Sequence, residues 1–389
     1  MIIKVKPYSK IYIAAPANHA TGGPELLHQL CYNLRNNLNY DALMYYYPGN
    51  IANPIHPEYL HYKNPYVRDV VDEEQNILIV PEVSSGIGLL KEGLKIQKYV
   101  WWLSVDNYFT SEVLRTKTNF FVKRVFNKIS SKLFHKPIFD LNTKIVFNLD
   151  FYIKKNAKRI KSLIDGINGN LVQSHYAKEI LSRIGTEGEN IGYLSDYLNL
   201  EFLKRSEFNS KLKMNIVAFN PLKGFAFTRK IISHSKTYNI DFVPIQNMKR
   251  TEVLDLLKSA KVYIDFGNHP GKDRLPREAA TLGACVITSR RGSAGYFEDV
   301  PIPEEYKFED TKENIPLIVA KIKDCLEHYE QRAKDFDYYR EIIAKEPEKF
   351  TNDVKKIFIA TGQSPSEGNL ESTASSMAFM SKSGKSFFG

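Results

Sequence analysis

A glycine-rich loop in the second half of the chain collects groups that suit an anionic ligand. Gly267 and Gly271 are followed by the cations Lys272, Arg274 and Arg277, with Asp273 between the first two. A helix is expected to begin beside them, at Pro276. Cationic side chains and free backbone N–H groups at a helix N-terminus favour phosphate oxygens. The loop therefore predicts a diphosphate site, and a solvated charge cluster is the alternative.

Other residues extend this predicted site. Arg274 can offer two parallel N–H groups to phosphate oxygens, and Glu278, one turn into the helix, can accept hydrogen bonds from vicinal ribose hydroxyls. Lys223 precedes the flexible Gly224 at the end of an expected strand, where its ammonium can meet a phosphate. A further glycine loop, at 291–295 and including Ser293, follows the next strand and can close over the same site.

The first half of the chain offers a weaker signal. Gly22 and Gly23 lie between an apolar strand and a helix that Pro24 opens. Two glycines there let a backbone approach a sugar or an anion at the positive end of the helix. A plain turn explains the pair equally well, since the spacing is not that of a dinucleotide-binding fingerprint.

Short apolar runs alternate with helical segments and position these loops. The first series of expected strands is 10–15, 42–47, 76–80, 98–104, 144–148, 170–174 and 191–195; the second is 214–219, 241–245, 261–266 and 284–289. Strands that are apolar on both faces indicate parallel sheets covered by helices. We predict two doubly wound, Rossmann-like α/β domains, at 1–205 and 206–360, facing a cleft. Helices at 311–358 close the second domain, and the serine-rich tail 361–389 is expected to be disordered.

Composition narrows the class of protein. The 389 residues are 43% apolar and 25% charged, which excludes collagen-like, low-complexity and wholly disordered chains. The three cysteines form no paired motif, so we expect a reducing, cytoplasmic compartment. No apolar run approaches the ~20 residues of a membrane span, which favours a soluble or peripheral protein. The net charge of +10 favours polyanionic partners.

A basic segment at 110–137 departs from the α/β pattern. Phe121, Val125 and Ile129 recur at helical spacing among lysines and arginines, as in a basic amphipathic helix that lies on an anionic membrane surface. An ordinary surface helix covering the first domain is the alternative. More cations follow and extend the same face: Lys154, Lys155, Lys158, Arg159 and Lys161.

Three motifs carry a resemblance. The segments 22–25, 220–224 and 274–283 look like those of bacterial glycosyltransferases of the GT-B fold, above all the large class that builds surface polysaccharides. The similarity covers about 11–308. It implies a nucleotide diphosphate sugar as donor, a glycan or lipid-linked oligosaccharide as acceptor, and no nucleic-acid partner.

The resemblance also implies roles for single residues. Lys223 and Arg274 would bind the diphosphate, Glu278 the ribose, and the stretch 243–246, including Ile245, the base. Many retaining members carry a second glutamate eight positions before the ribose glutamate, where this chain has Pro270. The task of that glutamate would fall to His269, Lys272 or Asp273. An inverting member would need a base in the first domain, and Asp106 is the first candidate, with His19 the second.

Neither a metal nor another cofactor is expected. The single Asp-x-Asp, Asp335 to Asp337, lies in a helical region away from strand ends, and the nine histidines form no metal-binding motif. Two other functions stay open on the sequence. One is a sugar-nucleotide epimerase or polyol-phosphate transferase of the same fold, and the other is a non-enzymatic nucleic-acid binder.

Overall fold

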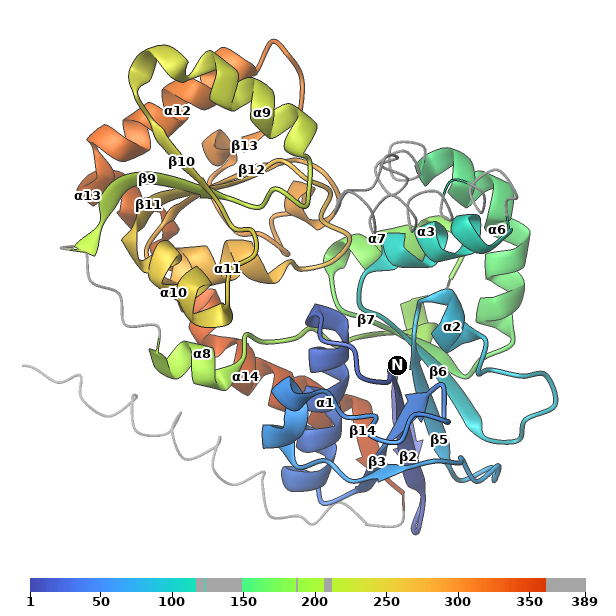
Figure 1. Ribbon diagram of the computed structural model, residues 1–389. Coiled ribbons are helices and arrows are strands. Elements are labelled where there is room, and N and C mark those ends of the chain that lie inside the picture. The colour runs from blue at the N-terminus through green and yellow to red at the C-terminus, as the bar shows by residue number, and fades with distance from the viewer. Residues whose placement is uncertain (117–122, 124–148, 187, 206–211, 362–389) are drawn as a thin grey trace, which may run out of the picture.

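Two large parallel sheets with helices on both faces, and one two-stranded sheet, make up the described protein (Figure 1). The computed structural model describes residues 1–116, 123, 149–186, 188–205 and 212–361. The predicted strand at 144–148, almost all of the basic segment beyond Thr116, and the tail from 362 onward lie outside the described residues. The prediction of two doubly wound domains is confirmed.

The first domain holds a seven-stranded parallel sheet. Its spatial order is β4 (Tyr66–Val67), β3 (Asp41–Tyr47), β2 (Lys10–Pro16), β5 (Ile77–Pro81), β6 (Gln97–Trp102), β7 (Gly169–Val172) and β8 (Ile191–Tyr193). The central strand β2 sends Ile11 and Ile13 into one apolar core and Tyr12 and Ala14 into the other. Because successive side chains of a strand point to opposite faces, both faces are buried and need helices over them.

Helices cover each face of this sheet. On one face lies α1 (Gly22–Asn36), and on the other lie α3 (Val105–Thr116), α6 (Leu149–Asp165) and α7 (His175–Arg183). Shorter elements complete the domain: η1 (Pro57–Tyr62), α2 (Ser84–Ile87) and η2 (Gly188–Asn190). The helix α8 (Leu200–Arg205) follows, and its Phe202 packs in the core of the second domain. No helix of the described chain combines the length and the apolar character needed to cross a bilayer.

The second domain holds a five-stranded parallel sheet. Its order is β10 (Asp241–Pro244), β9 (Met214–Phe219), β11 (Ala260–Asp265), β12 (Cys285–Ser289) and β13 (Lys307–Phe308). The helices around it are α9 (Phe225–His234), α10 (Arg250–Ser259), α11 (Arg274–Thr281), α12 (Ile315–Glu327) and α13 (Tyr329–Arg332). Single turns occur at η4 (Lys236–Tyr238), η5 (Ser293–Gly295), η6 (Glu304–Tyr306) and η7 (Ala333–Phe336).

The last helix returns from the second domain to the first. Early in α14 (Asp337–Ile357), Ile343 packs in the core of the second domain, whereas Phe350 and Val354 pack in the core of the first. The chain then forms β14 (Phe358–Ala360), which pairs in parallel with β1 (Ile3–Val5). The predicted boundaries, 1–205 and 206–360, do not include this passage of the chain back to the first domain. It connects the two domains at a second place.

Candidate functional site

The carboxyl edges of the two sheets face each other across a cavity of about 390 Å³. That volume falls within the ~300–1,000 Å³ typical of small-molecule sites. The first domain contributes the start of α1 and the loops after β6, β7 and β8, and the second contributes the loops after β9 and β11 and the start of α11. The charged side chains on its wall are Glu25, Asp196, Lys223, Asp265, Lys272, Asp273, Arg274 and Arg277.

Two loops of the second domain approach each other closely on this wall. Gly224 has φ +58°, and a Cβ there would lie 2.0 Å from the carbonyl oxygen of Phe266. A Cβ on Gly267 would lie 2.3 Å from the Cβ of Lys223. Only glycine tolerates both the left-handed backbone at 224 and this approach. The close fit sets Lys223, after β9, against the loop that follows β11.

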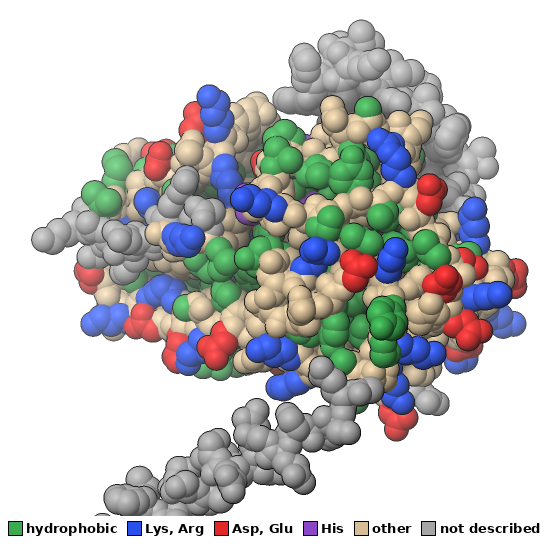
Figure 2. All heavy atoms as spheres, turned by 90° about the horizontal axis from the view of Figure 1, so that it is seen from below, with side chains coloured by type: hydrophobic (Ala, Val, Ile, Leu, Met, Phe, Trp, Pro, Cys, Tyr) green, Lys and Arg blue, Asp and Glu red, His purple; other side chains and the backbone are tan. Residues whose placement is uncertain are grey.

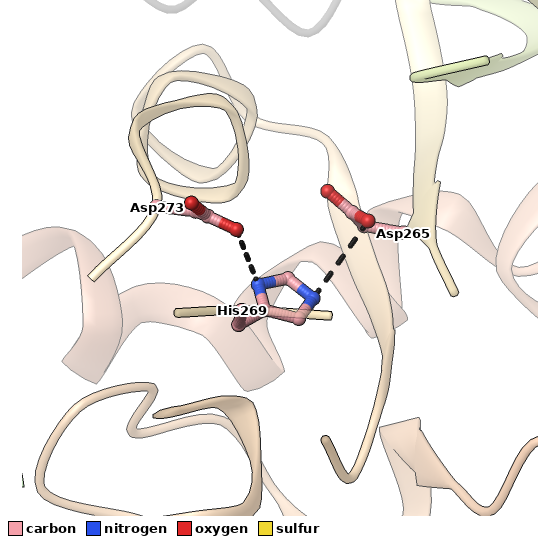
Figure 3. A group of neighbouring side chains, drawn as sticks. All are labelled: Asp265, His269 and Asp273. Atoms are coloured by element: carbon pink, nitrogen blue, oxygen red, sulfur yellow. Dashed lines mark ion pairs between the residues drawn. The ribbon is translucent and has the colours of Figure 1, made fainter. Parts of the chain in front are cut away.

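Lys223 belongs to a chain of four charged side chains. Its Nζ lies 2.5 Å from Asp273 Oδ2, and His269 Nδ1 lies 2.9 Å from the same oxygen. The other ring nitrogen of His269, Nε2, lies 3.7 Å from Asp265 Oδ1. The imidazole therefore lies between two carboxylates (Figure 3).

The charges in this cluster support one another. Burial raises the pKa of Asp273, but Lys223 and His269 outweigh burial, so its pKa lies below the ordinary value. Burial lowers the pKa of Lys223 and of His269, but the nearby aspartates outweigh burial and raise both above their ordinary values. The carboxylates thus favour the charged forms of Lys223 and His269, and these two groups favour the carboxylate form of Asp273.

Asp265, His269 and Asp273 are close enough together to be considered as metal ligands. One ligand atom of each residue lies within 4.8 Å of the others, and the two carboxylates face different nitrogens of the ring. Tyr263 Oη and the backbone N–H of Gly267 donate to the two oxygens of Asp265. Lys223 donates to the oxygen of Asp273 that faces His269. The expectation that the site uses no metal stays a prediction.

Arg274 joins the two domains across the cavity. Its Nη1 lies 3.2 Å from Glu25 Oε2 on α1, and its Nε lies 3.0 Å from Glu278 Oε1 on α11. The Arg274 side chain is 37% exposed, whereas both glutamates are buried. Asn199 donates to the other oxygen of Glu25 at 2.6 Å. Arg274 is thus held on two sides and still reaches the cavity.

Lys272 and Arg277 are engaged differently. Lys272 Nζ lies 2.9 Å from both Glu346 Oε1 and Ser195 Oγ. Arg277, only 2% exposed, donates to Asp196 at 2.5 Å and to Glu346 at 2.9 Å. These buried bonds tie α11 to α14 and to the segment after β8. Both cations consequently hold the protein together, whereas the sequence counted them among the groups for a ligand.

The fold is similar to that of solved glycosyltransferases, although no family model and no curated protein matches the chain. A glycosyltransferase from Rickettsia africae gives a TM-score of 0.56 at 12% identity over 90% of this chain and 99% of its own. Anabaena HepE, in complex with UDP and glucose, gives 0.54 at 10% identity over 89% and 98%. The chain has the GT-B fold. Sucrose-phosphate synthase from Thermosynechococcus elongatus, with 0.58 at 11% identity over 88% and 96%, supports the same assignment.

Within this GT-B fold, the cavity brings together six of the predicted binding residues: Gly22, Gly23, Lys223, Lys272, Asp273 and Arg274. Glu278 lies directly behind Arg274. Gly224 and Gly271 shape the loops without lining the cavity, and a Cβ on Gly271 would lie 2.3 Å from the carbonyl oxygen of Leu103 in the first domain. Ser293 donates to the carbonyl of Gly271 at 2.6 Å and so supports this loop from behind. Ile245 lies outside the cavity wall.

The three predicted catalytic residues do not line the cavity. His19 is exposed in the loop before α1, and His269 is fully buried behind Asp273. Asp106 is buried, and its two oxygens accept hydrogen bonds from Tyr176 at 2.7 Å and from Asn268 at 2.5 Å. Burial raises the pKa of Asp106 to about 6, against the two hydrogen bonds that lower it. Asp106 therefore joins the loop after β11 to the first domain.

Sequence reasoning assigned no role to several polar side chains of the first domain on the wall. They are Glu25, Asn107, Gln173 and Asp196. Gln173 directly follows β7, Asp196 comes three residues after the end of β8, and Glu25 comes two residues after Gly23. Because parallel strands end at one edge of the sheet, polar residues just after each strand are the signal that could have found them.

Proposed function

We propose that the chain is a glycosyltransferase that moves a sugar from a nucleotide diphosphate sugar to an acceptor hydroxyl. One observation carries the proposal: Lys223 and Arg274, two partly exposed cations, meet on one cavity between two sheet edges, with Glu278 beside Arg274. The complexes of Anabaena HepE with UDP and with UDP-glucose support a uridine nucleotide as the first donor to test.

In the proposed reaction, the acceptor oxygen forms a bond to the anomeric carbon of the sugar. The bond from that carbon to the β-phosphate oxygen breaks, and its electron pair leaves with the nucleoside diphosphate. Lys223, Arg274 and the N-terminus of α11 stabilise the charge that develops on the leaving group. Since Asp273 and Glu25 hold these two cations in the free protein, the diphosphate has to compete with both carboxylates.

Glu25 is our choice for the carboxylate that faces the acceptor. It lines the cavity from the first turn of α1, whereas Asp106 is not on the cavity wall. Asp196, the other first-domain carboxylate on the described wall, is bound to Arg277. When Arg274 moves to the diphosphate, Glu25 loses that ion pair and can accept the proton of an acceptor hydroxyl.

The acceptor is proposed to be a growing glycan or a lipid-linked oligosaccharide, at the cytoplasmic face of an anionic membrane. On α6, the buried side chains Tyr152, Ile153, Ile160 and Ile164 face the core, and Phe151 is exposed. The opposite face exposes the cations Lys154, Lys155, Lys158, Arg159 and Lys161. A basic face with an exposed aromatic ring supports attraction to anionic headgroups.

A nucleic-acid binder is less well supported. Figure 2 shows basic and acidic side chains interspersed around apolar ones on the face that it draws, whereas nucleic-acid binding favours a stripe of one sign. The partly exposed cations of the cavity lie in a recess rather than on an open face. An epimerase or polyol-phosphate transferase shares the fold, and its products distinguish it from a glycosyltransferase.

The proposal is tested first by a thermal-shift panel of nucleoside diphosphates. A ligand at 100 times its Kd stabilises the folded state by about 2.7 kcal/mol. The base that gives the shift then identifies the donor to use with candidate acceptors. Release of free nucleoside diphosphate with a glycosylated acceptor supports the transferase, whereas an isomeric nucleotide sugar would indicate an epimerase. No shift with any nucleoside diphosphate would refute the proposed function.

A further inference from the structure

One of the four charged groups at the cavity wall, His269, is out of reach of a ligand. Asp265, Asp273 and Lys223 line the cavity, whereas His269 is 0% exposed and lies behind them. Each nitrogen of its ring faces a different aspartate, as Figure 3 shows. Carboxylate oxygens at 2.9 and 3.7 Å from its two nitrogens favour the imidazolium form of the ring.

The backbone holds His269 in this place. Its carbonyl accepts the N–H of Ser293 at 2.8 Å, and residue 269 forms a β-bridge with Gly292. A Cβ on Gly292 would lie 2.0 Å from the His269 carbonyl oxygen, so the approach requires glycine. These backbone contacts fix residue 269 against the loop at 292–293.

The imidazolium balances the charge of the cluster. With the imidazolium, two carboxylates face two cations and the net charge of the four groups is zero. With a neutral ring, the net charge is −1 on the wall that must receive a diphosphate. The other charged groups around the ring do not change this difference. They are Asp106, hydrogen-bonded through both oxygens, and Asp310, which pairs with Arg291 at 2.9 Å.

We propose that His269 is a positioning residue for the donor, whose buried positive charge neutralises Asp265 and Asp273 so that Lys223 is free to bind the diphosphate. The inference rests on the proposed function, because it assumes that Lys223 meets a diphosphate. It gives His269 a role without contact to the substrate. Many retaining members of the resembled class have a second glutamate at the position of Pro270. In this proposal the loop contributes the charge of His269 instead.

The first test needs no ligand. Nitrogen NMR of the full-length chain, with the His269 signals assigned by their loss in His269→Asn, reports the protons on the ring at pH 6.5, below the raised pKa of His269. We expect both nitrogens to be protonated. A neutral ring would overturn the inference, as would a stoichiometric metal that copurifies with the chain and is lost from Asp265→Asn.

The second test measures binding of UDP-glucose by calorimetry. We expect His269→Asn to weaken binding about tenfold, as one added negative charge at ~10 Å does at an effective dielectric constant of ~20. Wild-type affinity should fall as the pH rises through the pKa of His269, which lies above 6.5. His269→Asn should show a smaller fall, because among the charged groups around the ring only Asp106 and Asp310, with pKa values of about 6 and about 7, then titrate in this range. His234→Asn, on the exposed side of α9, is the matched control and should bind like the wild type.

Charge rescue separates positioning from a merely structural role. The double variant Asp265→Asn with His269→Asn returns the cluster to neutrality, and we expect it to recover wild-type affinity within about threefold. A structural defect at His269 would persist or worsen in that double variant. In a Lys223→Ala background, His269→Asn should cause little further loss, since the two changes act on the same contact.

The outcomes distinguish the two proposals. If Lys223→Ala weakens UDP binding but His269→Asn does not, the role of His269 is wrong and the transferase assignment stands. If His269→Asn weakens binding and the double variant fails to recover it, the role is structural and the inference fails. If the wild type binds neither UDP-glucose nor any nucleoside diphosphate, the proposed function fails and this inference fails with it.

Discussion

Removal of the Lys223 ammonium is the most direct test of the donor site. Lys223 sits 2.5 Å from Asp273 on the cavity wall, and its side chain is 30% exposed, so it can turn to a bound phosphate. Hydrogen bonds to charged groups contribute about 1.5–3 kcal/mol, and Lys223→Ala should therefore weaken nucleoside diphosphate binding about 10- to 150-fold.

That loss has a measurable consequence for stability. With the ligand at 100 times the wild-type Kd, the wild type gains about 2.7 kcal/mol, whereas a variant that binds 10- to 150-fold more weakly gains only about 0.3–1.4 kcal/mol. Denaturant unfolding with and without UDP measures both gains. Lys230→Ala, on the exposed side of α9, is the control and should keep the full gain. An unchanged gain in Lys223→Ala, in a folded protein, would mean that the diphosphate binds elsewhere.

Three further predictions concern single residues. Glu278→Ala should remove the preference for UDP over its 2′-deoxy analogue, since its carboxylate is proposed to bind the ribose; competition binding measures this, and a retained preference would contradict the assignment. Arg277→Met leaves Asp196 and Glu346 without a shared cation and should lower the free energy of unfolding by about 3–5 kcal/mol in urea; a loss below 1 kcal/mol would contradict the assigned role of these buried bonds. Burial raises the pKa of Asp106 from 3.8 to about 6, so the native state binds more protons than the unfolded state between these values and wild-type stability falls as the pH rises through them. Asp106→Asn should lack that fall when unfolding is followed at pH 4 and pH 7, and an identical fall would refute this cause.

The strands were predictable because their signal is local. Residues 214–219 form β9 as predicted, and the other described strands of the two predicted series lie within a few residues of their expected bounds. Buried parallel strands are apolar on both faces, which makes each a short continuous run. The pair of β1 and β14 was missed because each strand has three residues and its partner lies at the other end of the chain.

The loops of the second domain were predictable for a similar reason. Glycines, cations and a helix start lie within ten residues of one another, so no distant contact is needed to bring them together. The sequence could not show which of these cations remain accessible to a ligand in the cavity. Lys272 and Arg277 look like Arg274 in the sequence, yet their carboxylate partners Glu346 and Asp196 lie 74 and 81 residues away.

The sequence by itself determined the two α/β domains and the place of the glycine-rich loop at 267–277, since apolar periodicity, glycines and helix starts act over a few residues. Only the tertiary structure decided which charges face the cavity, which ones neutralise one another behind it, and that Glu25 rather than His19 reaches it. The reason is physical: the energy of a buried charge depends on the groups within a few ångströms, and folding brings those groups from distant parts of the chain.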